Sequence, residues 1–335
     1  MPFTTTSNTE VKGKVLDVQL YIAQSAVLAH NLLYATEPKP GGASFHSEFN
    51  DTRTEHFLAG GSSLLSPIFG LSKRGILVAE NHLWFEDAEL GFYIFKALEK
   101  SKTWYKVEGN TILGTLMMFS PLALGVAHSF AMEGMKTSIN LSLDNAANVA
   151  EQFLKNSTTE DCVYLTQALN KFISDEISPS KKVEDDFNSF LKIHQNERTN
   201  LFEYTKFYES RDLIFHELSN KYRITLKYGY TTFTRTYEEN QNFKNAIIQT
   251  YITLLSEKKD THIAKRFGNE IATIVSKKAK NVVEAGGIFT QEGKTLINDL
   301  DKYLRSSQQR IINPGSTSDI TATTIFLALL QGYRP

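Results

Sequence analysis

Apolar residues recur every three or four positions along most of this chain, and that spacing predicts helices with one buried face. The clearest case is 11–35, which ends where two prolines and two glycines crowd the segment 37–42. The same pattern predicts helices at 51–64, 71–80, 85–100, 110–132, 143–155, 158–173, 187–194, 200–220, 239–258, 261–285, 290–307 and 317–331. We therefore expect an all-α fold.

Two stretches depart from the helical pattern. The segment 223–237 is rich in the β-favouring residues Ile, Thr, Tyr and Phe, so it is expected to form one short hairpin or irregular structure. The segment 174–186 is polar, charged and broken by Pro179, which is typical of a flexible loop; a loop within one domain and a domain boundary both stay open. Since no internal repeat is visible, we expect a single large multi-helix domain over 1–335.

The composition excludes several classes of protein. Hydrophobic residues are 41% and charged residues 22%, as in globular chains, and a net charge of −1 offers no footprint for nucleic acid. The uncharged segment 110–132 contains polar residues and a proline, which favours a buried helix over a membrane span. The N-terminus lacks the features of a signal peptide. The lone cysteine, Cys162, excludes an internal disulfide and fits a cytoplasmic protein, and a homo-oligomer stays open.

The turn from Asn313 to Asp319 precedes the last apolar helix. Ser316 and Asp319 have the spacing of a capping box, and Pro-Gly ends any preceding helix. A helix that begins among Gly315, Ser316 and Thr317 presents unpaired N–H groups and a partial positive charge, which favours a phosphate. Asp319 would then hold the Mg²⁺ of a polyphosphate. An ordinary capped helix explains the same residues.

A second polar group begins at Lys39. Lys39 and Gly41 belong to a rigid Pro-Gly turn at which an ammonium group can meet a phosphate. Asp51 and Glu55 are four residues apart, so a helix places both carboxylates on one face, as a magnesium site requires. Arg53 lies between them. A polar loop followed by an exposed first turn is the alternative reading.

Two polar pairs lie at or near predicted helix starts. Asn110 and Thr111 open the uncharged helix, either as its cap or as polar contacts for a ligand. Asp212 and His216 are one helical turn apart, so the acid can orient the imidazole as a general base, or the two can form a surface pair.

The segment 260–269 combines a cap with basic residues. His262 and Arg266 share one face of the predicted helix, with Lys265 beside them. Arg266 and Glu270 have the spacing of a helical ion pair, which is the simpler explanation. Gly268 inside this helix costs about 1 kcal/mol relative to alanine, so close packing or a ligand contact there would explain it.

Together, these motifs resemble the triphosphoribosyl-dephospho-CoA synthases. They occur in the order of that family: Glu37-Pro-Lys-Pro-Gly41, Phe49-Asn-Asp-Thr-Arg-Thr-Glu-His-Phe57, Asn110-Thr-Ile-Leu-Gly114 and Asn313-Pro-Gly-Ser-Thr-Ser-Asp-Ile-Thr-Ala322. The segment 260–268 is similar to the archaeal branch, and the resemblance covers most of the chain.

The resemblance implies an all-helical transferase in which the 2′-hydroxyl of dephospho-CoA attacks C1 of the ATP ribose. Adenine leaves and the triphosphate stays on the product, a prosthetic-group precursor. It implies candidate bases Glu55, His262 and His216; nucleotide contacts Lys39, Gly41, Arg53, Asn110, Thr111, Lys265, Arg266, Asn313, Gly315, Ser316 and Thr317; and Mg²⁺ ligands Asp51, Glu55 and Asp319. ATP and a dephospho-CoA-like acceptor are the expected partners, without nucleic acid or membrane.

One motif departs from the family pattern. Bacterial members resemble Asn-Thr-His-Lys-Gly where this chain has Asn110-Thr-Ile-Leu-Gly114, so a candidate base and a candidate phosphate contact are missing. Two alternatives follow: ribosyl or phosphoribosyl transfer to a different acceptor in another cofactor pathway, and a non-catalytic helical nucleotide-binding or scaffold protein. Convergence of the candidate residues on one place would favour an active site over a scaffold.

Overall fold

The computed structural model describes residues 7–49, 52–107, 109–134, 141–173, 190, 199–306 and 310–335, and these ranges form helices without a sheet. The first group of helices is α1 (Ser7–Ala35), α2 (Thr54–Ser63), α3 (Leu65–Ala79), η1 (Phe85–Ala88), α4 (Leu90–Trp104), α5 (Leu113–Met132), α6 (Leu143–Asn156) and α7 (Thr159–Ile173). The second is α9 (Leu201–Tyr208), α10 (Leu213–Ser219), η2 (Thr225–Tyr230), α11 (Thr231–Asn240), α12 (Phe243–Glu257), α13 (Thr261–Phe267), α14 (Asn269–Glu284), η3 (Gly287–Phe289), α15 (Gln291–Arg305) and α16 (Gly315–Leu330). The predicted all-α fold is confirmed.

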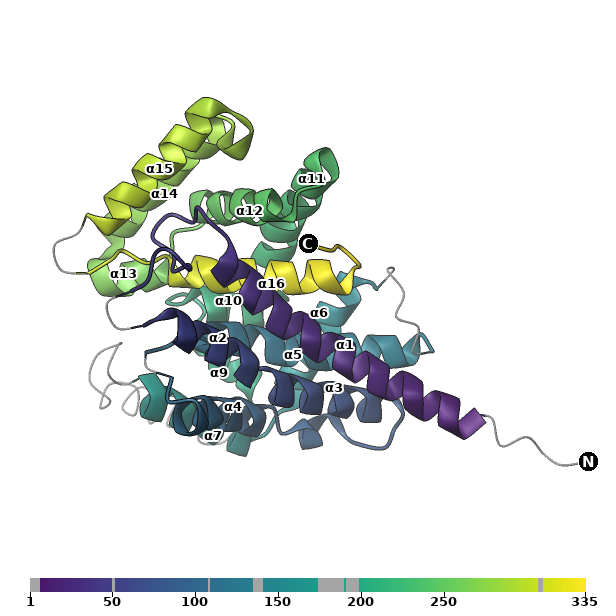
Figure 1. Ribbon diagram of the computed structural model, residues 1–335. Coiled ribbons are helices and arrows are strands. Elements are labelled where there is room, and N and C mark those ends of the chain that lie inside the picture. The colour runs from purple at the N-terminus through teal and green to yellow at the C-terminus, as the bar shows by residue number, and fades with distance from the viewer. Residues whose placement is uncertain are drawn as a thin grey trace, which may run out of the picture.

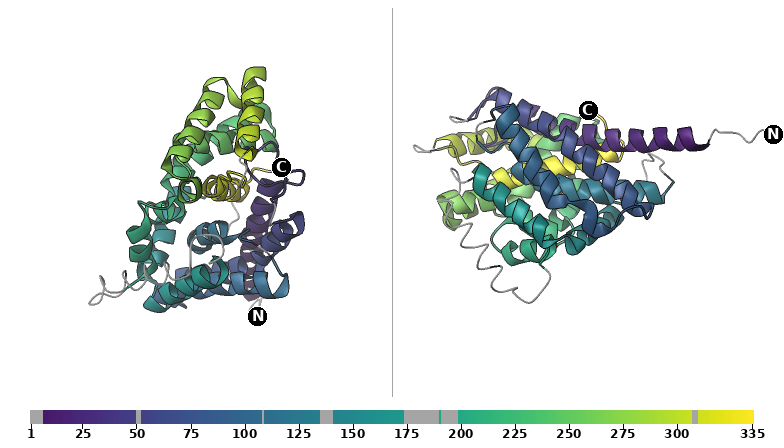
Figure 2. Two further views of the ribbon diagram at one scale, coloured as in Figure 1. Left: turned by 90° about the vertical axis from the view of Figure 1, so that its left-hand side faces the viewer. Right: turned by 90° about the horizontal axis from the view of Figure 1, so that it is seen from below.

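The last helix, α16, lies in the middle of the molecule (Figure 1). Helices α2 to α7 lie below it, α11, α12, α14 and α15 lie above it, and α13 lies beside its left end in Figure 1; the side view shows α16 between the lower and upper groups (Figure 2). It contacts α1, α5, η2, α12 and α13, and its residues from Ile320 to Leu330 are buried. Because α16 is apolar on all sides, it can only be stable inside the protein.

Helix α1 runs antiparallel to α16 along one side of the molecule (Figure 1). The Tyr21 hydroxyl donates to Leu329 O at 2.6 Å near one end of the pair. Near the other end, the loop after α1 brings Gly41 against Ile312. This pairing holds the first and last motifs of the chain at the same end of α16.

Helix α5 confirms that the uncharged segment 110–132 forms a buried helix. It is long and apolar enough to cross a membrane, but 83% of its most apolar stretch is buried inside the protein. It packs between α3, α6 and α16 and contains Pro121. Its apolar surface is therefore used for packing, as expected of a core helix.

Two clusters of buried apolar side chains form the interior. The larger joins α1 to α11 with α16, and the smaller joins α12, α13, α14 and α15. Helix α12 serves both, since Ile247 belongs to the larger cluster and Ile248 to the smaller. Cys162 is a free, buried thiol in the larger cluster, as predicted.

The extended structure predicted at 223–237 was wrong, because this stretch contains η2, a π-helix, and most of α11. A buried carboxylate explains the difference. Glu217 at the end of α10 accepts hydrogen bonds from Ile224 N at 2.8 Å and Thr225 N at 2.7 Å. Such a cap starts a helix whatever the β propensity of the residues that follow. The loop predicted at 174–186 lies outside the described residues.

Candidate active site

The two Pro-Gly turns of the chain contact each other. A Cβ placed on Gly41, whose φ is +68°, would lie 2.5 Å from Ile312 O and 3.0 Å from Pro314 Cδ, so only glycine fits. Gly41 N donates to Asp301 Oδ1 at 2.8 Å, and Arg305 Nη2 donates to Gly42 O at 2.7 Å. Two motifs far apart in the sequence are thus joined at the start of α16 (Figure 1).

Lys39 faces inward at this contact. Its Nζ donates to Thr36 O, and the side chain is only 4% exposed. Burial, the largest effect, lowers the pKa of Lys39 to about 7, so the ammonium is only partly charged at neutral pH. A contact between Lys39 and a phosphate stays a prediction. It would require the side chain to leave Thr36 O and turn toward the ligand.

Asp260 connects α13 to α16. Its Oδ1 accepts from Ile263 N at 2.9 Å, which caps α13, and its Oδ2 accepts from Thr317 N at 2.7 Å and Thr317 Oγ1 at 2.8 Å. Burial raises the pKa of Asp260, while these hydrogen bonds oppose the rise. Beside it, Thr261 Oγ1 lies 3.0 Å from Ser316 Oγ. One carboxylate therefore fixes the starts of two helices.

These contacts correct two expectations for Asn313–Asp319. The capping box was wrong, because α16 begins at Gly315 and no side chain from its own start caps it. The expectation of unpaired N–H groups was wrong at Thr317, whose N–H already donates to Asp260. The electrostatic argument that an anion prefers a helix start still holds. Here that anion is a carboxylate from another helix.

Asp319 faces α5. Thr115 Oγ1 donates to its Oδ1 at 2.7 Å, and a Cβ at Gly114 would overlap the carboxylate, so the missing side chain of Gly114 makes room for it. Burial is the largest effect and raises the pKa of Asp319 to about 7; the hydrogen bond from Thr115 opposes the rise, and the charges of Asp260 and Asp212 add to it. Asp319 therefore exchanges a proton near neutral pH.

Three buried polar atoms near this end of α5 have no hydrogen-bond partner in the described part of the chain: His30 Nδ1, Asn31 Oδ1 and Thr111 Oγ1. They surround Gly60 and Gly61 of α2, since a Cβ on Gly60 would overlap the Thr111 hydroxyl and one on Gly61 would lie 2.5 Å from Asn31 Oδ1. Burial lowers the pKa of His30 to about 4, so the ring is neutral. Unpaired buried polar atoms are costly, which is typical of places that take water or a ligand.

Asn31 and Thr111 both lie against the end of α2, where Asn31 faces Gly61 and Thr111 faces Gly60. Thr111 comes four residues before Thr115, which bonds to Asp319. We call the group Asn31, Thr111, Thr115, Asp260 and Asp319 the polar junction.

Helix α13 brings His262 to the other side of the α16 start. A Cβ on Gly315 would lie 3.0 Å from His262 Cγ, so the imidazole packs on the backbone of α16. Burial, followed by the charges of Arg266 and Lys265, lowers the pKa of His262 to about 4. Its Nε2 is buried without a partner among the described residues. A neutral imidazole of such low pKa is a weak base at pH 7.

The basic residues of α13 lie near its end. Lys265 Nζ donates to Asp212 Oδ2, and Arg266 lies one turn after His262. The single helix predicted at 261–285 was wrong, because it breaks at Gly268, whose φ is +89°. A Cβ there would meet nothing within 4 Å, so the positive φ, rather than close packing, explains this glycine.

Other candidate residues do not gather at the polar junction. Arg53 and Glu55 are exposed at the start of α2, and Asp51 lies outside the described residues. The predicted Asp212–His216 pair does not form: Asp212 caps α10 through Ile214 N at 2.7 Å, and His216 Nδ1 lies 3.5 Å from Asn220 Nδ2. Asn110 Oδ1 accepts from Leu113 N at 3.0 Å, which is the capping role weighed above.

A magnesium site made only of protein is not visible, because no three His, Cys, Asp or Glu side chains gather within the described ranges. A magnesium ion that arrives on a polyphosphate needs only one or two protein carboxylates, since phosphate and water supply the other ligands. Asp212 and Asp260, whose charges act on Asp319, already have their oxygens bound by Lys265 and by backbone N–H groups. They leave Asp319 as the one carboxylate of this group that fits such an ion.

Sequence reasoning overlooked Asn31 and Thr115. Both lie within strongly apolar stretches, where a polar residue in a buried helix is a signal of function or of a paired contact. Thr115 bonds to Asp319, which is 204 positions away, and Asn31 faces Gly61 of another helix. Neither contact can be predicted from the sequence without the fold.

The fold and the polar junction define a class: an all-helical protein whose last helix carries a titratable carboxylate against a second buried helix. The sequence model of one family, described as CitG, ATP:dephospho-CoA triphosphoribosyl transferase, matches residues 19–335. The chain belongs to this family.

Individual relatives agree with this assignment. A probable 2-(5″-triphosphoribosyl)-3′-dephosphocoenzyme-A synthase of Salmonella gallinarum is 27% identical over 112 residues, 33% of this chain and 36% of that protein. The corresponding synthase of Klebsiella pneumoniae is 29% identical over 96 residues, 29% of this chain and 31% of that protein. The chain thus matches about a third of the length of these curated relatives.

A solved structure supports the fold. The crystal structure from Archaeoglobus fulgidus that is assigned as a triphosphoribosyl-dephospho-CoA synthase superposes with a TM-score of 0.51 at 21% identity. The match covers 81% of this chain and all of that one. At this identity the likeness concerns the helical fold alone.

Proposed function

We propose that this protein transfers the triphosphoribosyl group of ATP to the 2′-hydroxyl of dephospho-CoA and releases adenine. The family assignment over residues 19–335 is the observation that carries this proposal. The meeting of the Lys39 and Asn313 turns with Asp319 and α13 at one end of α16 supports an active site there over a scaffold. We further infer a cytoplasmic location, where ATP is abundant.

The attacking hydroxyl must lose its proton, and we assign that proton to Asp319. Its carboxylate is held by Thr115 and has a pKa of about 7, near the optimum for a general base at neutral pH. Glu55, His216 and His262 were the predicted bases. Glu55 is exposed on α2, His216 lies beside Asn220 on α10, and His262 has a pKa of about 4.

The triphosphate requires positive charge, and α13 supplies it. Lys265 and Arg266 lie near the end of this helix, on the side of α16 that His262 packs against. Arginine and lysine make strong charge-assisted hydrogen bonds to phosphate. In this proposal magnesium arrives bound to the phosphates of ATP, so it does not depend on a resident metal site.

Release of free adenine tests the proposal. Pure protein incubated with ATP, Mg²⁺ and dephospho-CoA should release one adenine for each dephospho-CoA consumed, as measured by chromatography. ATP alone should release none, because the acceptor is the nucleophile. Absence of adenine from folded protein would overturn the proposal.

Transfer to a different acceptor is the second candidate. The observation that favours it is the stretch Asn110-Thr-Ile-Leu-Gly114, in which Ile112 and Leu113 are buried apolar side chains where bacterial relatives resemble His-Lys. Adenine release that requires another hydroxyl-bearing cofactor precursor, and not dephospho-CoA, would select this candidate.

A further inference from the structure

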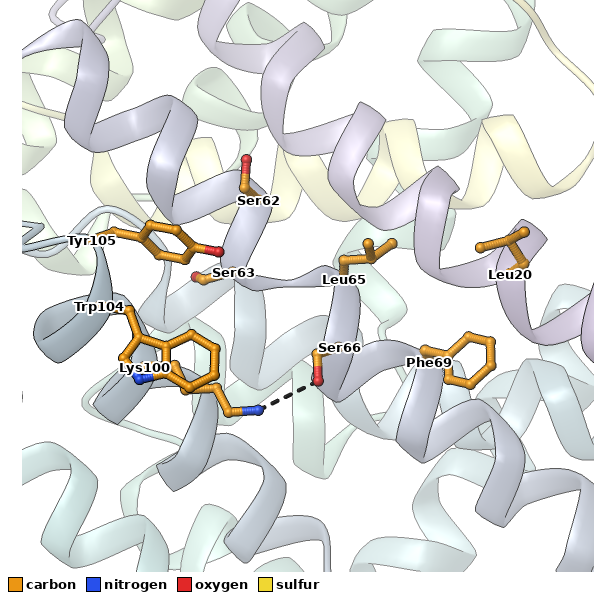
Figure 3. Close-up of a pocket in the computed structure, with 9 residues that line it drawn as sticks. All are labelled: Leu20, Ser62, Ser63, Leu65, Ser66, Phe69, Lys100, Trp104 and Tyr105. Carbon is orange, nitrogen blue, oxygen red and sulfur yellow. Dashed lines mark hydrogen bonds between the residues drawn. The ribbon is translucent and has the colours of Figure 1, made fainter.

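An open groove of about 380 Å³ is lined by residues of α1 to α4 and the residue after α4, and none of the lining residues that the structure describes belongs to the polar junction (Figure 3). Its lining residues are Leu20, Ser62, Ser63, Leu65, Ser66, Phe69, Lys100, Trp104 and Tyr105. This volume is within the range of small-molecule sites in proteins, which is roughly 300–1,000 Å³. None of the motifs discussed above accounts for it.

The groove exposes aromatic and aliphatic side chains that most proteins bury. Trp104 is 67% exposed, Tyr105 47%, Leu65 42% and Leu20 39%. In Figure 3 the Trp104 and Tyr105 rings lie on one side, with Leu65, Phe69 and Leu20 on the other. Exposed apolar surface gathered around a hollow is typical of a ligand groove, whereas scattered apolar residues are not.

The polar groups of the groove match a neutral or anionic ligand. Among the lining residues that the structure describes, Lys100 is the only charged one and none is a carboxylate. Its Nζ lies 5.1 Å from the Trp104 ring and 3.5 Å from Ser66 Oγ (Figure 3). Ser62 and Ser63 donate their hydroxyl hydrogens to Leu58 O at 2.9 Å and Gly60 O at 2.6 Å. Their oxygens are left to accept hydrogen bonds, as from amide N–H groups.

A short chain of contacts links the groove to the polar junction. Ser63 bonds to Gly60, and the backbone of Gly60 packs against Thr111 at the start of α5. Gly114, one turn into that start, lies against Asp319. On the outer side, Lys102 Nζ donates to Gly109 O and ties the end of α4 to the loop before Asn110. These contacts connect the groove, through the last turn of α2, to the start of α5 and to Asp319.

We propose that the groove binds the pantetheine arm of the acceptor. This arm is a neutral chain with two amides, two methyl groups and an adjoining diphosphate; the apolar walls suit the methyl groups, the serines the amides and Lys100 the phosphate. The inference rests on the proposed function, in which the reacting ribose hydroxyl lies at Asp319. The diphosphate lies between that hydroxyl and the arm, so the arm binds outside the polar junction.

Tryptophan fluorescence tests this inference without turnover. The chain has two tryptophans, and Trp84, which is 76% exposed, does not line the groove. In W84F protein, whose remaining tryptophan is Trp104, titration with pantetheine alone should change the emission along a saturable curve. W104F protein is the matched control, because its remaining tryptophan is Trp84 and its emission should not change. Equal responses in both, or no response in either, would overturn the inference.

Kinetics provide the second measurement. Trp104→Ala should raise the KM for dephospho-CoA about tenfold, equivalent to about 1.4 kcal/mol, and leave the KM for ATP unchanged. Trp84→Ala should change neither. A rise in the KM for ATP would assign the groove to the donor instead, and a shift of W84F protein to a larger assembly without any pantetheine response would assign it to a second copy; both contradict the inference. If wild-type protein binds pantetheine but releases no adenine, the proposed function fails while the groove stands.

Discussion

Two carboxylates beside the same helix differ in what surrounds them. Asp260 accepts hydrogen bonds from Ile263 N, Thr317 N and Thr317 Oγ1 at 2.7–2.9 Å, so both of its oxygens are used to join helices. Asp319 is bonded by Thr115 on a neighbouring helix and pressed against Gly114. Burial raises the pKa of both. The difference teaches that a buried acid can hold a fold together or carry a mobile proton, according to its hydrogen bonds.

The largest expected effect is on chemistry at Asp319. Asp319→Asn keeps the shape but removes the proton acceptor, so adenine release should fall by about 10²- to 10⁴-fold, the usual contribution of a general base. In the absence of Mg²⁺, ATP binding by equilibrium dialysis should stay within about twofold, equivalent to about 0.4 kcal/mol. Unchanged turnover would return Asp319 to a structural role.

The stability of Asp319→Asn relative to wild type should change with pH in a definite direction. Since the pKa of folded Asp319 is about 7, against about 3.9 for an unfolded aspartate, ionisation disfavours the fold. The stability that the protonated carboxyl of Asp319 contributes is fully present below about pH 4 and is lost as the pH rises to about 7. In calorimetry at pH 8, the melting temperature of Asp319→Asn should therefore be equal to or higher than that of wild type. At pH 4 any such increase should disappear.

Asp260 should show the opposite behaviour. Asp260→Ala leaves buried N–H groups of Ile263 and Thr317 without partners, so the free energy of unfolding should fall by about 2–4 kcal/mol. Urea denaturation measures this. Asp144→Ala, which removes an exposed acid from the first turn of α6, is the matched control and should cost less than about 0.5 kcal/mol. Equal effects in the two variants would mean that Asp260 does not join the helices.

The smallest effect is a shift of the pH profile. Adenine release by wild type should rise with pH and level off above about 7, because the base must be ionised. Thr115→Val removes a hydrogen bond that favours the ionised carboxylate, so the midpoint should move upward by about one pH unit. A midpoint that stays in place would show that another group sets the profile.

The sequence was most informative about local structure. Apolar spacing was enough to predict the buried helix α5 and the end of α1, because helices record their buried faces every three or four residues. It failed where distant groups decide. Asp260 caps α16 from 57 positions away, and Glu217 turns a β-favouring stretch into helix.

In the candidate site, too, the sequence predicted which motifs matter but not how distant residues act on them. The motifs that resemble the family drew attention to Lys39, His262 and Asp319, and the fold brings all three turns to one end of α16. Their chemical roles depend on burial, which the sequence does not contain. Lys39 faces inward, His262 is neutral, and burial together with the charges of Asp260 and Asp212 raises the pKa of Asp319 to about 7.

The most direct test compares Asp319→Asn with wild type in one rapid mixing experiment with saturating ATP, Mg²⁺ and dephospho-CoA. If Asp319 takes the proton of the attacking hydroxyl, wild type should release adenine and the variant should bind both substrates yet release about 10²- to 10⁴-fold less per second. Adenine release at the wild-type rate by the variant would contradict the account.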